Sequence, residues 1–176
     1  MWNGLLNLPA LLAAILLSVH PSPKIVNNTF PATEYRDSSY NMIVIHYDSS
    51  NSLWTTLRYL KRKGNAYHYI IDRMGTIHKL IDPKFQARHA GLSKWAGRYH
   101  VNEFSIGICL QNNGIGPYTI KQYISLAWLV NILERRYPDI TKSRIVGHAQ
   151  IAIPKGRKRD PGPEFNWTEL YSLINR

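Results

Sequence analysis

The apolar residues of this 176-residue chain follow two different spacings along the sequence. Residues 42–47 and 104–110 are short apolar runs rich in β-branched side chains, which is typical of buried strands, and 144–148 is a shorter run of the same kind. Residues 67–72 and 76–81 flank a short turn that contains glycine, and this arrangement predicts a hairpin. The chain is therefore expected to form a sheet from strands scattered along its length.

Other stretches have the spacing of helices. Residues 52–62 and 119–137 carry apolar side chains on one helical face, and the second stretch begins with a capping box. A last helix is predicted at 167–174. Residues 83–102 have no clear period and predict a long loop, a kind of segment that often has a function. Because 44% of the residues are hydrophobic, a chain of this length can build one proper core, and we expect a single domain.

The N-terminal segment 1–22 contains no Lys, Arg, Asp or Glu. Its apolar run, residues 5–19, is short for a membrane span but has the length of a signal-peptide core. No basic residue precedes the run and 18–22 is a poor A-x-A cleavage site, so an uncleaved N-terminal anchor remains the alternative. We therefore expect an exported protein of the periplasm or cell envelope. Residues 23–40 predict a linker or arm, and residues 41–176 the catalytic domain.

The formal net charge is +11, and no charged residue lies within the first 22 positions. Such a balance favours a polyanionic partner, either nucleic acid or an anionic cell wall or membrane surface. Alternatively, the basic runs 61–63 and 157–159 are solvated loop charges. The chain has one cysteine, Cys109, so no intrachain disulfide can form. Since Cys109 falls in an apolar run, we expect it to pack as a small hydrophobic residue.

Three possible metal ligands lie on separate predicted elements. His46 ends one strand, His148 ends another, and Asp160 belongs to a loop made rigid by two prolines. Two imidazoles and one carboxylate form the ligand set of a catalytic Zn²⁺ site, with the fourth position open to water. Spacing alone leaves a structural role for the histidines open, because neither HExxH nor CxxC occurs and histidines at strand ends are commonly partly buried.

A series of sequence blocks runs in a fixed order from about residue 42 to residue 167. The blocks are Ile43-Val44-Ile45-His46, Tyr67-His68-Tyr69-Ile70-Ile71-Asp72, Arg88-His89-Ala90-Gly91, Asn102-Glu103-Phe104-Ser105-Ile106-Gly107-Ile108, Val146-Gly147-His148 and Lys158-Arg159-Asp160-Pro161-Gly162-Pro163. In this order they resemble the zinc-dependent N-acetylmuramoyl-L-alanine amidases of the amidase-2 type, a family similar to phage amidase lysozymes and peptidoglycan recognition proteins. The ordered series is far more specific than any single block.

The resemblance implies a fold and a site. The fold is a single α/β domain with a central mixed β-sheet flanked by α-helices, and the cleft lies where the strands end. His46, His148 and Asp160 then hold zinc, and Lys158 stabilises the oxyanion that forms when water attacks the amide carbonyl. The amide in question joins N-acetylmuramic acid to L-alanine in peptidoglycan or muropeptides. We expect no nucleic acid and no stable protein partner.

Two further residues match positions near the family's cleft. Tyr67 corresponds to a catalytic tyrosine of the phage branch, and the alternative is an aromatic side chain that packs on the sheet. His89 corresponds to a substrate-binding histidine in a loop, and the alternative is a structural hydrogen bond. One position departs from the pattern, because many bacterial members carry a glutamate where this chain has Cys109 to Gln111. The general acid or base is therefore left without an assigned residue.

Two rival functions follow from the same residues. The first is a peptidoglycan-recognition module without catalysis, and such relatives typically lose a zinc ligand, whereas all three matched positions here still hold one. The second is a basic nucleic-acid binder, which would interleave aromatic and arginine side chains on one sheet face. The ordered blocks argue against this second rival and favour the amidase.

Overall fold

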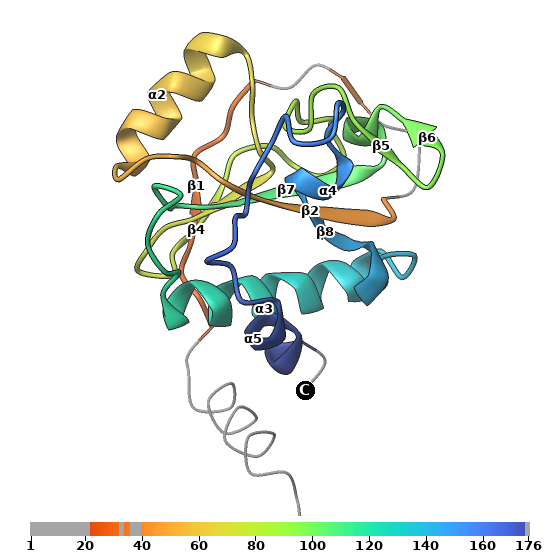
Figure 1. Ribbon diagram of the computed structural model, residues 1–176. Coiled ribbons are helices and arrows are strands. Elements are labelled where there is room, and N and C mark those ends of the chain that lie inside the picture. The colour runs from red at the N-terminus through yellow and green to blue at the C-terminus, as the bar shows by residue number, and fades with distance from the viewer. Residues whose placement is uncertain (1–21, 32–33, 36–39, 175–176) are drawn as a thin grey trace, which may run out of the picture.

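The computed structural model places the helices on both sides of one central sheet (Figure 1) and describes residues 22–31, 34–35 and 40–174. The sheet has six strands in the order β1-β4-β3-β7-β2-β8. The β3–β4 pair is antiparallel and every other pair is parallel, so the sheet is mixed. The predicted fold class, a single α/β domain with a central mixed sheet and flanking helices, is confirmed.

The strands β2, β3, β4, β7 and β8 match the apolar runs of the sequence, and β1 falls in the predicted arm. Their bounds are β1 Ile25–Asn27, β2 Met42–Tyr47, β3 Tyr69–Ile71, β4 Ile77–Lys79, β7 Ser105–Leu110 and β8 Ile145–Gly147. The predicted hairpin is the β3–β4 pair. The arm expected at 23–40 contributes β1, which pairs in parallel with β4. The long loop predicted at 83–102 contains the two-residue strands β5 Lys94–Trp95 and β6 Arg98–Tyr99 and the short helix η1 Val101–Glu103.

Helices cover the two faces of the sheet unequally. The long helix α3, Ile120–Arg136, runs along one face and the C-terminal helix α5, Trp167–Leu173, packs behind it (Figure 1). The predicted capping box is present at Thr119 and Gln122, which fixes where α3 begins. Helix α2, Leu53–Lys63, lies on the other side of the sheet together with the loops. The remaining short helices are η2, Lys142–Arg144, and α4, His148–Ile151.

Side chains of β7 alternate between large and small, and this alternation separates the core from the site. Ile106, Ile108 and Leu110 belong to the main core against α3. Ser105, Gly107 and Cys109 point to the opposite face, because successive residues of a strand alternate. In the register of the parallel β2–β7 pair, Cys109 lies beside His46. The large side chains therefore build the core, while the small ones leave room for the groups that follow.

Candidate metal centre

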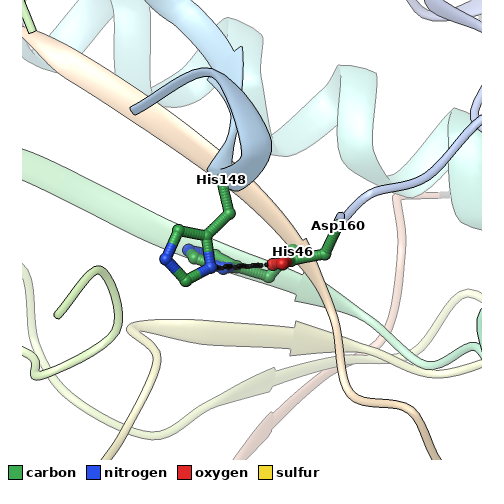
Figure 2. A group of neighbouring side chains, drawn as sticks. All are labelled: His46, His148 and Asp160. Carbon is green, nitrogen blue, oxygen red and sulfur yellow. Dashed lines mark hydrogen bonds and ion pairs between the residues drawn. The ribbon is translucent and has the colours of Figure 1, made fainter. Parts of the chain in front are cut away.

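Three buried side chains converge at one end of the parallel strands (Figure 2). His46 comes from the end of β2, His148 is the first residue of α4 directly after β8, and Asp160 comes from the following loop. The Nδ1 atoms of His46 and His148 are 3.1 Å apart. Asp160 Oδ2 lies 2.8 Å from His46 Nδ1 and 3.0 Å from His148 Nδ1. The three predicted ligands thus each place one atom at a common point, although His46 and Asp160 are 114 residues apart in the sequence.

The spacing of these atoms suits a small metal ion. A tetrahedral site with bonds of about 2.0–2.2 Å holds its ligand atoms about 3.3–3.6 Å apart, so the observed separations need only a small expansion. All three residues are buried, with exposed fractions of 1%, 3% and 7% for His46, His148 and Asp160. A shielded set of two imidazole nitrogens and one carboxylate oxygen has the chemistry of a divalent metal site.

The protonation states of the ligands agree with this assignment. Burial lowers the pKa of His46 to about 4, because the charged imidazolium loses its hydration and the raising effect of Asp160 does not compensate. Burial opposes charge on Asp160 as well, but its contacts with His148 and His46 outweigh that cost and hold its pKa below the usual range. At neutral pH the site therefore contains a neutral His46 and an anionic Asp160, the forms that bind metal.

A backbone carbonyl sets the tautomer of His148. The Nε2 atom of His148 lies 2.9 Å from the carbonyl oxygen of Ala90, which can only accept a hydrogen bond, so Nε2 carries the proton. A neutral His148 then directs the lone pair of Nδ1 toward Asp160 Oδ2, which is also an acceptor. Two acceptors 3.0 Å apart repel each other unless a proton or a metal cation lies between them. A metal ion bound by both atoms would remove this repulsion.

Arg157 holds that carbonyl in place. Its guanidinium donates to the carbonyl oxygens of Ala90 at 3.2 Å, Leu92 at 2.7 Å and Ile153 at 2.8 Å. The amide oxygen of Asn102 accepts from the backbone N–H groups of His89 and Ala90. Arg157 is exposed, as the solvated-loop alternative has it, but its donors also join two loops beside the site.

Close packing also fixes Asp160 relative to His148. A Cβ atom on Gly147 would lie 2.5 Å from Cδ of Pro161, so only glycine fits directly before His148. The backbone N–H of Ala149 donates to the carbonyl oxygen of Asp160 at 2.9 Å. These contacts hold the loop of Asp160 against the start of α4, next to His148.

His89 is a neighbour of the candidate metal ligand His46. It is buried, with 8% exposed, and its Nδ1 lies 3.0 Å from His46 Nε2. Its Nε2 lies 3.3 Å from the Ser105 hydroxyl. A Cβ atom on Gly107 would come within 2.5 Å of the His89 ring, so the glycine makes space for it. Both ring nitrogens contact protein groups, which supports the structural alternative, while substrate binding by His89 stays a prediction.

The candidate site opens into a cleft of about 690 Å³. His89, His148 and Asp160 line it together with Tyr67 and the exposed side chain of Lys158. Three arginines add to the positive charge of the lining, namely Arg88, Arg157 and Arg159. The cleft therefore brings the predicted catalytic residues together with the ligands and favours an anionic ligand.

Tyr67 and Cys109 lie next to His46 on the inner side of the cleft. The rings of Tyr67 and His46 are 5.1 Å apart between centroids. Burial raises the pKa of the Tyr67 hydroxyl well above its usual value, so the phenol keeps its proton and remains a donor. Cys109 is fully buried among Leu60, Ile70 and Leu80, and burial raises its pKa as well. The thiol therefore packs as a small hydrophobic group, as predicted.

Sequence reasoning overlooked a half-buried carboxylate of the cleft lining, Asp48. It accepts hydrogen bonds from the Thr56 hydroxyl and from the backbone N–H groups of Ser50 and Asn112. These contacts join the end of β2 to α2 and to the segment after β7. The signal was present in the sequence, because an Asp in the turn Asp48-Ser49-Ser50 is suited to bond the backbone two residues later.

A mixed sheet with two imidazoles and a carboxylate at its strand ends defines a metal-site domain of the α/β class. Residues 36–163 match the Amidase_2 family, described as N-acetylmuramoyl-L-alanine amidase. The chain belongs to this family, which confirms the resemblance drawn from the ordered blocks.

Individual relatives agree with the family. The chain is 44% identical over 107 residues to the 1,6-anhydro-N-acetylmuramyl-L-alanine amidase AmpD of Haemophilus influenzae, which corresponds to 61% of this chain and 57% of AmpD. The chain thus spans somewhat more than half the length of the curated AmpD relatives.

Solved structures extend the likeness to nearly the whole fold. A crystal structure of a selenomethionine AmpD derivative superimposes with a TM-score of 0.73 at 30% identity, over 88% of this chain and 96% of that one. AmiD of Escherichia coli, in complex with anhydro-N-acetylmuramic acid-L-Ala-D-γ-Glu-L-Lys, gives a TM-score of 0.71 at 29% identity, over 82% of this chain and 62% of that one.

The prediction of export to the periplasm or cell envelope is wrong. The AmpD enzymes that this chain resembles are not exported. The prediction relied on the apolar run 5–19, and hydropathy alone is a weak signal when no basic residue precedes it. Residues 1–21, on which the predicted leader falls, lie outside the described residues. Among the residues that are described, no helix is long and apolar enough to cross a membrane.

Proposed function

We propose that this protein is a zinc-dependent amidase that hydrolyses the bond between N-acetylmuramic acid and L-alanine. Family membership and the names of the AmpD relatives support this activity. The preserved ligand set supports a catalyst over a module that only binds, because such a module does not need two histidines and an aspartate aimed at one point. The single observation that carries the proposal is the convergence of His46, His148 and Asp160 at one point, with His148 and Asp160 lining a cleft.

Zinc is the proposed ion because of the donor set. Two neutral imidazoles and one carboxylate are the set used by hydrolytic zinc sites, whereas Mg²⁺ and Ca²⁺ prefer oxygen ligands alone. When bound, a zinc ion polarises a carbonyl oxygen and lowers the pKa of a water molecule to about 7.

Two side chains of the cleft lining supply the remaining chemistry in this proposal. Lys158 lines the same cleft as Asp160, two residues away in the sequence, and in this proposal its ammonium group stabilises the negative charge that develops on the attacked amide oxygen. The protonated Tyr67 hydroxyl donates to the water or to the substrate carbonyl. Cys109 contributes no acid or base in this scheme, since it is buried and protonated.

The proposed substrate is a 1,6-anhydro-muropeptide. The AmpD relatives carry this substrate class in their names, and AmiD binds an anhydro-muramyl tripeptide in its crystal structure. A γ-linked glutamate in such a peptide has a free carboxylate, and the cleft lining of Arg88, Arg157, Lys158 and Arg159 suits an anionic group.

Product analysis on purified substrates tests this function. We expect the zinc-loaded protein to release the peptide with a free L-alanine amine from an anhydro-muropeptide, and mass spectrometry identifies both halves. Parallel digestion of intact cell-wall sacculi measures the preference between the two substrates. Stoichiometric zinc without any release of peptide would favour the binding module instead.

A further inference from the structure

We propose that Ser105 and His89 form a hydrogen-bond relay that keeps the proton of His46 on Nε2, so that Nδ1 offers its lone pair to the metal. The relay is a line of close contacts across the site face of the sheet. It runs from His46 Nε2 to His89 Nδ1 at 3.0 Å, then from His89 Nε2 to Ser105 Oγ at 3.3 Å. It ends at the carbonyl oxygen of Val101, 2.6 Å from Ser105 Oγ.

The Val101 carbonyl determines the direction of every bond in this line. A carbonyl oxygen only accepts, so the Ser105 hydroxyl donates its one proton to Val101. The Ser105 oxygen must then accept from His89, which places the His89 proton on Nε2. A neutral His89 has a lone pair on Nδ1, and that lone pair accepts from His46 Nε2. Nδ1 of a neutral His46 is thereby left without a proton.

The reverse direction disables the site. If His89 carried its proton on Nδ1, it would donate to His46 Nε2, and the proton of a neutral His46 would move to Nδ1. A protonated Nδ1 cannot bind a metal ion. Ser105 therefore acts as a positioning residue through His89, although it contacts no ligand atom and does not itself line the cleft.

Space for the relay comes from the small side chains of β7. Ser105 and Gly107 lie on the same face of the strand, and a Cβ atom on Gly107 would overlap the His89 ring. Every member of the relay is buried, with Ser105 and Val101 at 0% exposed. Removal of the buried Ser105 oxygen leaves less space than a water molecule occupies, so His89 should lose this partner and zinc binding should weaken.

Zinc affinity of the full chain tests the relay, which rests on the zinc site of the proposed function. Competition with a chromophoric chelator gives the dissociation constants of the wild type and of Ser105→Ala. We expect the substitution to weaken zinc binding by about 10- to 100-fold, the range for partners that orient a ligand. Ser125→Ala is the matched control, because Ser125 is also buried and its hydroxyl also donates to a carbonyl at 2.6 Å, that of Gly75.

Long-range ¹H–¹⁵N spectra of the histidine rings provide a second readout that depends on tautomers and not on stability. In the wild type we expect protons on Nε2 of both His46 and His89, and a changed His89 signal in Ser105→Ala. Equal zinc affinity of Ser105→Ala and Ser125→Ala, or a wild-type His89 proton on Nδ1, would overturn the relay. A wild type that binds no zinc would instead refute the proposed function, and the spectra would still test the relay.

Discussion

The two histidines of the proposed metal site are held by opposite kinds of contact. His46 depends on side chains, since its Nε2 faces His89 and His89 faces Ser105. His148 depends on the backbone, since its Nε2 donates to the carbonyl of Ala90. A backbone carbonyl survives substitution at its own position, whereas a side-chain relay can be removed by one mutation. The His46 half of the site is therefore the more sensitive to sequence, and the His148 half the more sensitive to loop geometry.

Removal of either ligand is the largest expected effect, and it should be equal on the two sides. We expect His46→Ala and His148→Ala each to lose bound zinc and amidase activity, because two remaining donors hold the ion too weakly. Elemental analysis of the purified variants measures zinc, and peptide release measures activity. Full activity of the wild type in the presence of a strong chelator would contradict the role of the metal.

Lys158 tests the chemistry on the His148 side. We expect Lys158→Ala to lower kcat by about 10²- to 10³-fold with unchanged zinc content, because the ammonium acts on charge that appears only in the transition state. Arg159→Ala is the matched control, since Arg159 is the adjacent basic residue of the same cleft lining. A near-normal kcat for Lys158→Ala would show that Lys158 is a surface charge without a role in catalysis.

Tyr67 tests the chemistry on the His46 side. We expect Tyr67→Phe to lower kcat by about 10-fold or more, because the phenol donor lies beside His46 and no carboxylate replaces it at Cys109. The comparison is Cys109→Ser at equal zinc occupancy, which should keep most activity. Loss of turnover in Cys109→Ser, together with normal turnover in Tyr67→Phe, would contradict this assignment. The catalytic role would then belong to Cys109 in β7 and not to Tyr67.

Arg157→Ala is expected to give the smallest effect. It tests directly whether the backbone support of His148 is less sensitive to mutation than the side-chain support of His46. We expect Arg157→Ala to weaken zinc binding by less than about 10-fold, below the effect of Ser105→Ala, because the Ala90 carbonyl remains in the chain after its guanidinium partner is lost. The same chelator competition measures both variants. A larger loss in Arg157→Ala than in Ser105→Ala would show that loop geometry dominates over the side-chain relay.

The strand ends and the three candidate ligands were predictable from the sequence. The residues that hold the candidate ligands in place, such as His89 and Arg157, were not. His46 and His148 end apolar runs whose period is readable in one dimension, and the blocks around Asp160 carry the family pattern. The contact between His89 and His46 depends on the path of a loop without a period, so no spacing rule reaches it. The contacts of Arg157 were not predictable for a similar reason, because an exposed basic run gives no sign that its guanidinium donates to three carbonyls.

A usable signal for the relay was nevertheless present in β7. The run Ser105-Ile106-Gly107-Ile108-Cys109-Leu110 alternates small and large side chains. A buried strand with small residues on one face leaves a volume that another group must fill, since protein interiors are closely packed. Here the group is His89, and the pattern marks the face of the sheet on which the site is built.

The single amide oxygen of Asn102 accepts from the N–H groups of both His89 and Ala90, the residues that contact His46 and His148. One anchor thus restrains both imidazoles through adjacent peptide groups. Opening of this loop would free the two ligands in the same event, so release of the metal and exposure of these two amides should share one rate. The hydrogen-exchange rate of the His89 and Ala90 amides would then report the rate of metal release. This measurement needs neither substrate nor a variant of the protein.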